Sequence, residues 1–292
     1  MILLLSLFAC IGQEDSLSIM VPQGSPTLSI LGLDEHDYAI DIVNGPDPLV
    51  AAFGSGSHDA IIAPTNLGAK FYQSSDEYKL FAVIGLGNYH LVSTSFVDDS
   101  IHQINGKDIL VFGQNQTSDI IVKHLLNEMS ITATLNYVDS VASAVAQFLM
   151  DPTQIVLVAE PSLSLIKAQI PNLYSIDLND TYETLHEGLS FPQASLFVNK
   201  NISNHLKERL KEDMDDSILF LHDQMTLAAQ KGVALGILDD QDILEDAISG
   251  SHVTIIYSQD AKSMIEQYFE IILAMNPALI GGTIPNDDFY ME

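Results

Sequence analysis

Residues 38–66 constrain the fold more than any other part of the chain, because short apolar runs alternate there with well-defined turns. The first run, residues 38–43, ends at the sequence NGP (44–46), through which no strand continues. Asp47 follows as a candidate helix N-cap, and Pro48 suits the first position of a helix. These residues predict a strand, a turn and then a helix.

The second half of the same stretch repeats this pattern. The sequence GSGS (54–57) ends the helix, and residues 60–63 form an apolar run without alternation. Such a run is typical of a strand buried on both faces of a parallel sheet. The sequence PTN (64–66) follows it and opens another helix over residues 67–72. The stretch therefore predicts a βαβα unit, and such units bind ligands beyond the carboxyl ends of their strands.

The βα pattern occurs twice along the chain, once before and once after about residue 97. Ser25 is a candidate N-cap for a helix to about residue 33, residues 203–236 should be helical, and residues 276–292 should form a loop. Further strands are expected at residues 17–21, 80–84, 90–94, 108–112, 132–138, 155–159, 173–176, 194–199 and 253–257.

The charge balance limits the partners of this chain. It has 11 Lys and Arg against 39 Asp and Glu, a formal charge of −28. A surface this acidic repels phosphate backbones, so we expect no binding to nucleic acid. The acidity itself is typical of a solvated surface that favours solubility.

The chain begins with the apolar sequence MILLLSLFAC and contains one cysteine, Cys10. The sequence LFAC (7–10) resembles a bacterial lipobox, in which the cysteine is lipidated after cleavage. It departs from that pattern in lacking a Lys or Arg ahead of the apolar run, and Phe8 is bulkier than usual. The alternative is a buried cysteine at the start of a first strand. We favour lipidation of Cys10 and a membrane attachment through that lipid.

Motifs of catalysis and cofactor binding are missing from the sequence. It contains no GxxxxGK[ST], HExxH or GxSxG motif, and its histidines do not pair at helical or zinc-ligand spacing. The acidic turns at residues 213–216 and 239–242 lack the spacing of a calcium loop. We therefore expect no catalytic residues, no metal and no cofactor.

Four segments resemble one protein class: PQGSP (22–26), NGPDPLVAAF (44–53), APTNLGAKFY (63–72) and FPQASLFV (191–198). Together with the ending of the chain, they resemble the substrate-binding lipoproteins of bacterial ABC importers. The nearest class is the type-2 periplasmic binding proteins, which include binders of thiamine pyrimidine precursors, nitrate, sulfonate and taurine.

This resemblance implies an α/β fold of two lobes, each a sheet flanked by helices, with a ligand cleft between them. The implied divisions are a signal and tether at 1–15, the first part of lobe 1 at 16–95, lobe 2 at 96–192, and the return to lobe 1 with the C-terminal helices at 193–292. Segments 94–98 and 191–194 would be the hinge. The implied protein is an extracytoplasmic, lipid-anchored monomer that passes a small molecule to an ABC transporter permease.

In that class the ligand is held by turns at the carboxyl ends of strands and by helix N-termini. Free backbone N–H groups there favour acceptor atoms, and short polar side chains add directional hydrogen bonds. Each such residue could instead only cap its own helix. The candidate ligand-binding residues are Gln23, Gly24, Ser25, Asn44, Asp47, Thr65, Asn66, Asn88, Tyr89, Gln114, Thr117, Ser118 and Glu160.

Two other functions compete with the receptor. A related scaffold supports a pyrimidine-synthesising enzyme, which would require an essential histidine in the cleft, and His90 is the histidine next to a candidate site residue. A sensor domain is the third possibility. Arg209 is the single arginine and no lysine lies in the candidate turns, so we expect a neutral or weakly cationic polar ligand, such as a heteroaromatic thiamine precursor, over nitrate or a sulfonate.

Overall fold

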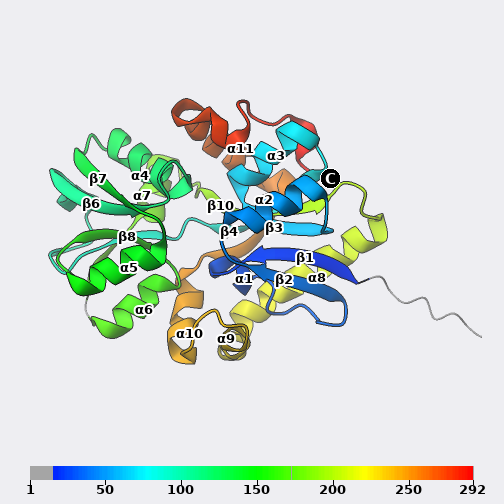
Figure 1. Ribbon diagram of the computed structural model, residues 1–292, viewed down its shortest axis with the longest axis horizontal. Coiled ribbons are helices and arrows are strands. Elements are labelled where there is room, and N and C mark those ends of the chain that lie inside the picture. Colours follow the sequence, from blue (N-terminus) through cyan, green and yellow to red (C-terminus); the bar gives the residue numbers. More distant parts are fainter. Residues whose placement is uncertain (1–15, 172, 292) are drawn as a thin grey trace, which may run out of the picture.

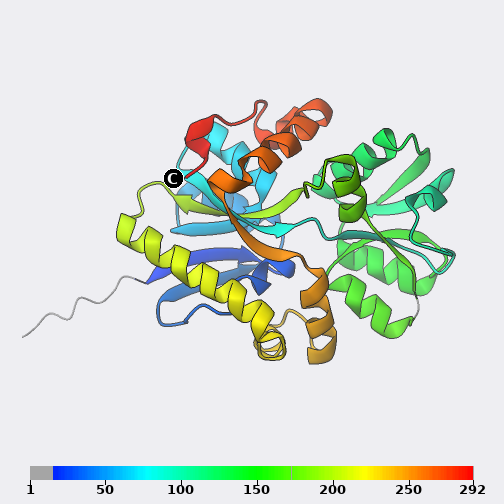
Figure 2. The same ribbon diagram turned by 180° about the vertical axis from the view of Figure 1, so that it is seen from behind.

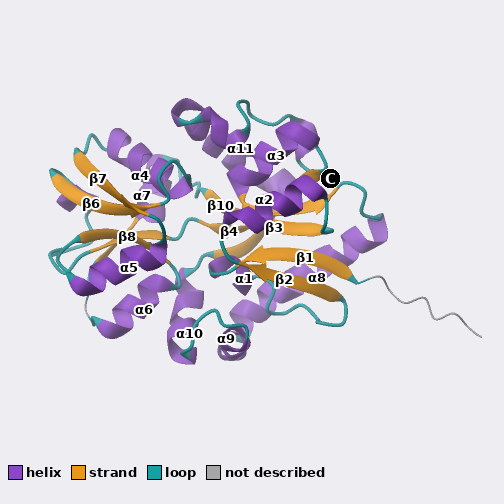
Figure 3. Ribbon diagram, viewed as in Figure 1, coloured by secondary structure: helices purple, strands orange, loops and turns teal. Residues whose placement is uncertain are grey.

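The computed structural model describes residues 16–171 and 173–291, which form two lobes lying side by side (Figure 1). Each lobe contains one β-sheet with helices packed on both of its faces (Figure 3). Among the described residues, no helix is both long enough and apolar enough to cross a lipid bilayer.

The sheet of lobe 1 has six strands in the order β11-β4-β10-β3-β1-β2. β1, β2 and β3 run parallel, whereas β10 is antiparallel to its neighbours β3 and β4. The predicted βαβα unit is confirmed as β2-α2-β3-α3. The strands are β1 (Leu17–Pro22), β2 (Tyr38–Val43), β3 (Ala60–Pro64), β4 (Tyr78–Leu86), β10 (Pro192–Asn199) and β11 (Val253–Tyr257).

The helices of lobe 1 bury the two faces of this sheet. Phe53 of α2, Ala69 of α3 and Phe269 of α11 pack in the core on one face, and Leu210 and Met214 of α8 pack on the other. The helices are α1 (Ser25–Leu28), α2 (Pro46–Ser55), α3 (Thr65–Ser75), α8 (Asn204–Asp223), α9 (Met225–Ala234), α10 (Gln241–Gly250) and α11 (Ser258–Met275).

Lobe 2 has a five-stranded sheet in the order β7-β6-β8-β5-β9, with β5 antiparallel to both of its neighbours. Ser140 caps α5, accepting a hydrogen bond from the Ser143 N–H at 3.1 Å. The strands are β5 (Tyr89–Val92), β6 (Lys107–Phe112), β7 (Ala133–Val138), β8 (Ile155–Ala159) and β9 (Ser175–Asp177). The helices are α4 (Thr117–Glu128), α5 (Val141–Met150), α6 (Ser162–Gln169) and α7 (Leu178–Leu185), with a 3₁₀ turn η1 (Ile101–Ile104).

The chain crosses from lobe 1 to lobe 2 between Leu86 and Tyr89, which is earlier than the predicted segment 94–98. The expected division after residue 95 is therefore placed too late, because β5 already belongs to the sheet of lobe 2. The chain returns to lobe 1 between the end of α7 at Leu185 and the start of β10 at Pro192. Both crossings are visible from behind in Figure 2.

Two predicted N-caps are wrong. The N-cap of α2 is Gly45, with φ of 76°, so Pro46 begins the helix and Asp47 lies in its first turn. The N-cap of α1 is Gly24, with φ of 113°, and α1 ends at Leu28. Glycine suits both caps because its missing Cβ allows positive φ. The Ser25 side chain is thus free to bond elsewhere.

Other differences concern the second half of the chain. The predicted helix over residues 203–236 is divided at Gln224 into α8 and α9, and α7 was not expected. The C-terminal tail is not a plain loop, because it forms the 3₁₀ turns η2 (Pro277–Ile280) and η3 (Asp287–Phe289). Phe289 is fully buried in the core of lobe 1, so this tail is part of the fold.

Gly68 allows α3 to lie directly against β10. A Cβ at this position would come within 2.1 Å of the Phe197 ring, and Phe197 is fully buried. Gly54, on α2, is the matched contrast, since it is exposed and no heavy atom lies within 4 Å of its Cβ position. Alanine substitutions at the two glycines therefore distinguish the effect of overpacking the core from the effect of helix propensity.

We expect Gly68→Ala to lower the free energy of unfolding by about 1–3 kcal/mol, because it overpacks a filled core. Gly54→Ala should keep or raise stability, by up to about 1 kcal/mol, because alanine is the better helix former. Urea unfolding followed by circular dichroism measures both variants. Wild-type stability of Gly68→Ala would contradict the close packing of α3 on β10.

Candidate functional site

The carboxyl ends of β1, β3, β6 and β8 point toward the boundary between the lobes (Figure 1). Polar side chains from both lobes meet there. They form two buried groups. The Ser25 cluster consists of Ser25, Asn88, Glu160, Gln193 and Ser251, and the Asn66 cluster consists of Asn66, Thr117 and Tyr268.

In the Ser25 cluster, a single hydroxyl joins the lobes. The Ser25 hydroxyl donates to the Glu160 carbonyl oxygen at 2.9 Å and accepts from the Asn88 side-chain amide at 3.0 Å. Asn88 is held in turn by Gln193, whose amide donates to the Asn88 Oδ1 at 2.9 Å. Ser25 belongs to lobe 1, Glu160 to lobe 2, and Asn88 to the crossing between them. This cluster therefore ties both lobes to the crossing segment.

The Asn66 cluster makes a second bridge between the lobes. Thr117, the first residue of α4, donates its hydroxyl to the Asn66 Oδ1 at 3.1 Å. The Tyr268 hydroxyl from α11 donates to the Thr117 Oγ1 at 3.3 Å. The three side chains are buried. A polar group buried in this way is costly without a partner, so these bonds stabilise the closed arrangement of the lobes.

Neither cluster contains a Lys or Arg side chain. The only ionisable carboxyl is that of Glu160, whose pKa is raised by burial. Its two oxygens accept hydrogen bonds from the Ser164 N–H at 3.1 Å and the Ser164 hydroxyl at 3.0 Å. The clusters thus offer neutral donors and acceptors beside one carboxyl, an arrangement that does not favour an anion.

Aromatic rings lie beside both clusters. The Tyr89 and Phe191 rings stack with centroids 5.8 Å apart, and Phe191 also stacks on Tyr268 at 6.5 Å. Burial raises the pKa values of the Tyr89 and Tyr268 hydroxyls, so both remain neutral at physiological pH. These rings could stack on a planar ligand if the lobes opened.

The two crossing segments pack against one another at Gly87. A Cβ at Gly87 would lie 2.2 Å from the Phe191 ring, so a larger residue does not fit there without movement. His252, just before β11, donates its Nδ1–H to the Gly87 carbonyl oxygen at 2.6 Å. Both crossings and the start of β11 therefore form one packed unit behind the clusters.

The structure brings together only part of the predicted site. Ser25, Asn66, Asn88, Thr117 and Glu160 meet in the clusters, and Tyr89 lies beside them. Gly24 caps α1. The buried Thr65 and Ser118 hydroxyls bond within their own lobes, to the Ser195 hydroxyl and the Phe112 carbonyl oxygen. The remaining four candidates, which are exposed on the surface, are Gln23, Asn44, Asp47 and Gln114. Cys10 lies outside the described residues.

Sequence reasoning missed three members of the clusters. Gln193 lies within the quoted segment FPQASLFV, so its position next to the crossing was a usable signal. Tyr268 and Ser251 gave no such signal, because Tyr268 occupies an ordinary apolar position of α11 and Ser251 follows the end of α10. Their contribution depends on how the C-terminal helices pack.

Two of the histidines that do not pair in sequence spacing come together in lobe 2. The Nε2 atoms of His124 and His186 lie 2.8 Å apart, and their rings stack. Burial lowers the pKa of both. No group of three or more His, Cys, Asp or Glu side chains suited to a metal ion occurs among the described residues.

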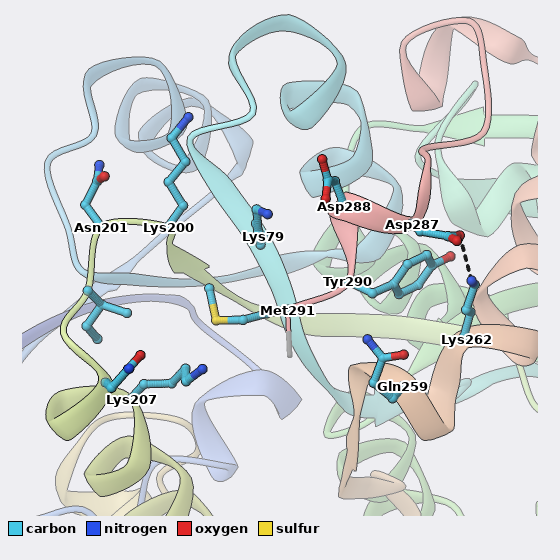
Figure 4. A pocket seen from close by; sticks show the side chains of 12 residues that line it. Lys79, Lys200, Asn201, Lys207, Gln259, Lys262, Asp287, Asp288, Tyr290 and Met291 are labelled. Carbon is cyan, nitrogen blue, oxygen red and sulfur yellow. Dashed lines mark hydrogen bonds and ion pairs between the residues drawn. The ribbon is translucent and has the colours of Figure 1, made fainter.

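A groove of about 710 Å³ lies on lobe 1, away from the clusters (Figure 4). Four lysines, Lys79, Lys200, Lys207 and Lys262, reach into it. Its charge is largely compensated within the protein, because Lys200 pairs with Asp76 at 2.6 Å and Lys262 pairs with Asp287 at 2.7 Å. We therefore do not assign the functional site to this groove.

His90 of β5 lines a cavity between α6 and α10, which is also lined by Glu160 of the Ser25 cluster. Burial is the main cause that lowers the pKa of its imidazole to about 3, and the charges of Lys167 and His252 add to it. The charge of Asp180 raises the pKa of His90. The Asp177 carboxylate lies 3.9 Å from the His90 Nδ1. The folded protein therefore holds His90 neutral.

Acid should destabilise the folded protein through His90. In the unfolded chain its pKa returns to about 6.5, so the unfolded state binds this proton first as the pH falls. Stability is unaffected by His90 above about pH 6.5 and decreases by up to about 1.4 kcal/mol per pH unit between about pH 6.5 and pH 3.

Urea unfolding of the wild type and His90→Gln between about pH 7 and pH 4 measures this effect. Burial raises the pKa values of Glu160 and Asp177, and these carboxyls contribute with the opposite sign in both proteins. The difference between the two profiles therefore isolates His90. Identical pH dependence in the two proteins would show that His90 is not held neutral by its burial.

No protein-family model matches the chain, and no curated protein matches it. Several solved structures, in contrast, match the chain. An ABC transporter protein from Parabacteroides distasonis is 18% identical, with a TM-score of 0.84 over 95% of this chain and 99% of that chain. The periplasmic aliphatic sulphonate binding protein SsuA from Escherichia coli is 12% identical, with a TM-score of 0.70 over 93% of this chain and 92% of that one.

A ligand-binding component of an ABC-type import system from Staphylococcus aureus is 13% identical, with a TM-score of 0.66 over 95% of this chain and 96% of that chain. At such low identity the likeness establishes the fold. The predicted fold class is confirmed: the chain has the two-lobed α/β fold of the periplasmic binding proteins.

Proposed function

We propose that this protein is a solute-binding receptor that encloses a small polar molecule between its lobes and delivers it to an ABC transporter permease. The observation that carries the proposal is the set of buried polar side chains that form hydrogen bonds directly across the boundary between the lobes, two to other side chains and one to the Glu160 backbone carbonyl oxygen. A binding protein needs such groups on both lobes, because a ligand must contact each lobe to favour closure.

The bonds between the lobes give a physical reason for ligand-dependent closure. When the lobes separate, water replaces each of these bonds, so the net cost of opening is about 1 kcal/mol per bond. A ligand that bonds to Ser25 or Asn66 of lobe 1 and to Thr117 or Glu160 of lobe 2 would replace the lost hydrogen bonds between the lobes. The segments around Gly87 and Phe191 would then carry the hinge rotation.

The charge of the site favours a neutral or weakly cationic ligand. The guanidinium of Arg209, the single arginine of the chain, lies over the Tyr38 ring, 5.9 Å from its centroid, and so belongs to the outer face of lobe 1. Sulfonate receptors such as the one from Escherichia coli bind anions, for which Glu160 would be unfavourable. Neutral heteroaromatics can use the amide and hydroxyl groups and stack on Tyr89.

The enzyme alternative requires a histidine at the polar clusters. His90 does not meet this requirement, because neither of its ring nitrogens bonds to a described member of either cluster. The solved structures named above are an ABC transporter protein, a sulphonate-binding protein and a ligand-binding component of an ABC-type import system. These observations support a binding function over catalysis.

A thermal-shift screen of pyrimidines, amines, amino acids, sulfonates and inorganic anions tests the proposal. A true ligand at hundredfold excess over its Kd should stabilise the protein by about 2.7 kcal/mol. Thr117→Val keeps the side-chain shape but removes the hydroxyl, so it should weaken binding of that ligand by about fivefold to thirtyfold. Thr134→Val, which alters an exposed side chain on β7, is the matched control and should bind as the wild type does.

Three outcomes of this screen would count against the proposal. A shift caused only by sulfonates or nitrate would show that the charge argument is wrong. Equal binding by Thr117→Val and Thr134→Val would place the ligand elsewhere on the protein. If no compound class shifted the transition, the receptor function itself would lose its support.

We also propose that the receptor is a monomer located outside the cytoplasm and attached to the membrane by a lipid on Cys10. The support is the lipobox-like sequence before this cysteine. Metabolic labelling with a radioactive fatty acid should mark the wild type but not Cys10→Ser, and an unlabelled wild type would contradict the anchor. Two or more acyl chains on one residue would hold the protein durably, whereas one chain binds only marginally.

A further inference from the structure

A cavity of about 400 Å³ opens between α6 of lobe 2 and α10 of lobe 1, behind the Ser25 cluster. We call it the hinge cavity. Its walls include apolar side chains such as Leu163, and its polar lining comes from both lobes. The ionisable lining residues are His90, Glu160, Lys167, Asp177, Asp246 and His252.

His90 is the feature of the hinge cavity that points most directly to a ligand. Its residue surface is only 7% exposed, and neither ring nitrogen has a hydrogen-bond partner among the described residues. A buried imidazole without partners is costly. Because this ring is neutral, one nitrogen is an acceptor and the other a donor. Both nitrogens are buried in this structure, so an occupant of the cavity that carries N–H groups would satisfy the acceptor after a small movement of the ring.

The charged groups that line the hinge cavity determine which sign of charge its occupant can carry. Three carboxyl groups, those of Glu160, Asp177 and Asp246, face a single ammonium, that of Lys167. Asp177 uses its Oδ1 to cap α7, which leaves its Oδ2 with only the distant His90 Nδ1 at 3.9 Å. Asp246 is exposed at the rim and makes no hydrogen bond or ion pair with a described residue. A cation therefore fits and an anion does not.

The size and walls of the hinge cavity favour an organic cation over a metal ion. The described His, Asp and Glu side chains form no group of three that could surround a metal. A volume of about 400 Å³ also exceeds what a bare ion fills, and the Leu163 and Ala168 side chains suit methylene groups. An alkylammonium group has both a charged head with several N–H donors and an apolar body.

We propose that the hinge cavity binds a small organic ammonium cation, held by the His90 imidazole and by carboxylates of both lobes. Asp177 and Glu160 belong to lobe 2, whereas Asp246 and His252 belong to lobe 1. A cation bound there contacts both lobes at once and favours their closed arrangement. By linkage, it raises the affinity for any ligand that also prefers closure. Glu160 is common to this site and the Ser25 cluster, whereas His90, Asp177 and Asp246 belong to the hinge cavity and to neither cluster.

Calorimetric titration of the full chain with putrescine tests this site. The control titrant is 1,4-butanediol, which has the same carbon chain but no charge, and ionic strength is held constant with sodium chloride. We expect saturable binding of putrescine at neutral pH and none of the diol. Asp177→Asn keeps a side chain that can cap α7, and Asp246→Asn alters an exposed residue, so both variants should fold.

We expect each of these two variants to weaken putrescine binding at least tenfold. Asp242→Asn removes an equal charge from α10 outside the cavity lining and should bind putrescine as the wild type does. The site is overturned if the wild type does not bind putrescine, if the diol binds equally well, or if all three variants bind alike. Saturable binding of calcium but not of putrescine would also overturn it, in favour of a metal site.

Discussion

The hydrogen bond from the Ser25 hydroxyl to the Glu160 carbonyl oxygen shows the constraint on which the rest of this structure depends. Polar groups buried between two lobes must have partners, and here each lobe supplies the partners of the other. The Thr117 hydroxyl and the Asn66 amide repeat this relation on the other side of the boundary. Because water can replace such bonds at little net cost, the same groups allow the lobes to separate and allow a polar solute to bind between them.

The fold places these groups where they can act together. Strands β1, β3, β6 and β8 end at the boundary, so their following turns bring Ser25, Asn66, Thr117 and Glu160 to one region. Behind them, Gly87 lets the two crossing segments pack closely and keeps them in register. The helices α10 and α6 meet below this unit and α11 and α4 meet above it, so closure is supported on both sides.

Local sequence signals predicted the layers of the fold well, because apolar runs bounded by Gly and Pro specify strands wherever they pack. Four cluster residues, Ser25, Asn66, Thr117 and Glu160, could be named from one rule, that polar residues after parallel strands share an edge, and Asn88 from its place near the predicted crossing. Tyr268 could not, because nothing local separates it from the other apolar positions of α11. The predicted crossing lies too late in the chain because residues 80–84 and 90–94 indicate two strands, and no local signal says which sheet each strand joins. Ser25 looked like a helix cap, and only the packing of the lobes gives its hydroxyl another partner.

Solution X-ray scattering of the protein, alone and saturated with a ligand identified by screening, tests the central claim most directly. If the polar clusters hold the lobes together weakly and a solute reinforces them, the free protein should populate open arrangements and its radius of gyration should decrease on binding. The same titration of Thr117→Val should require more ligand to reach the same radius. An unchanged radius at saturation in the wild type would contradict a receptor that works by closing its lobes.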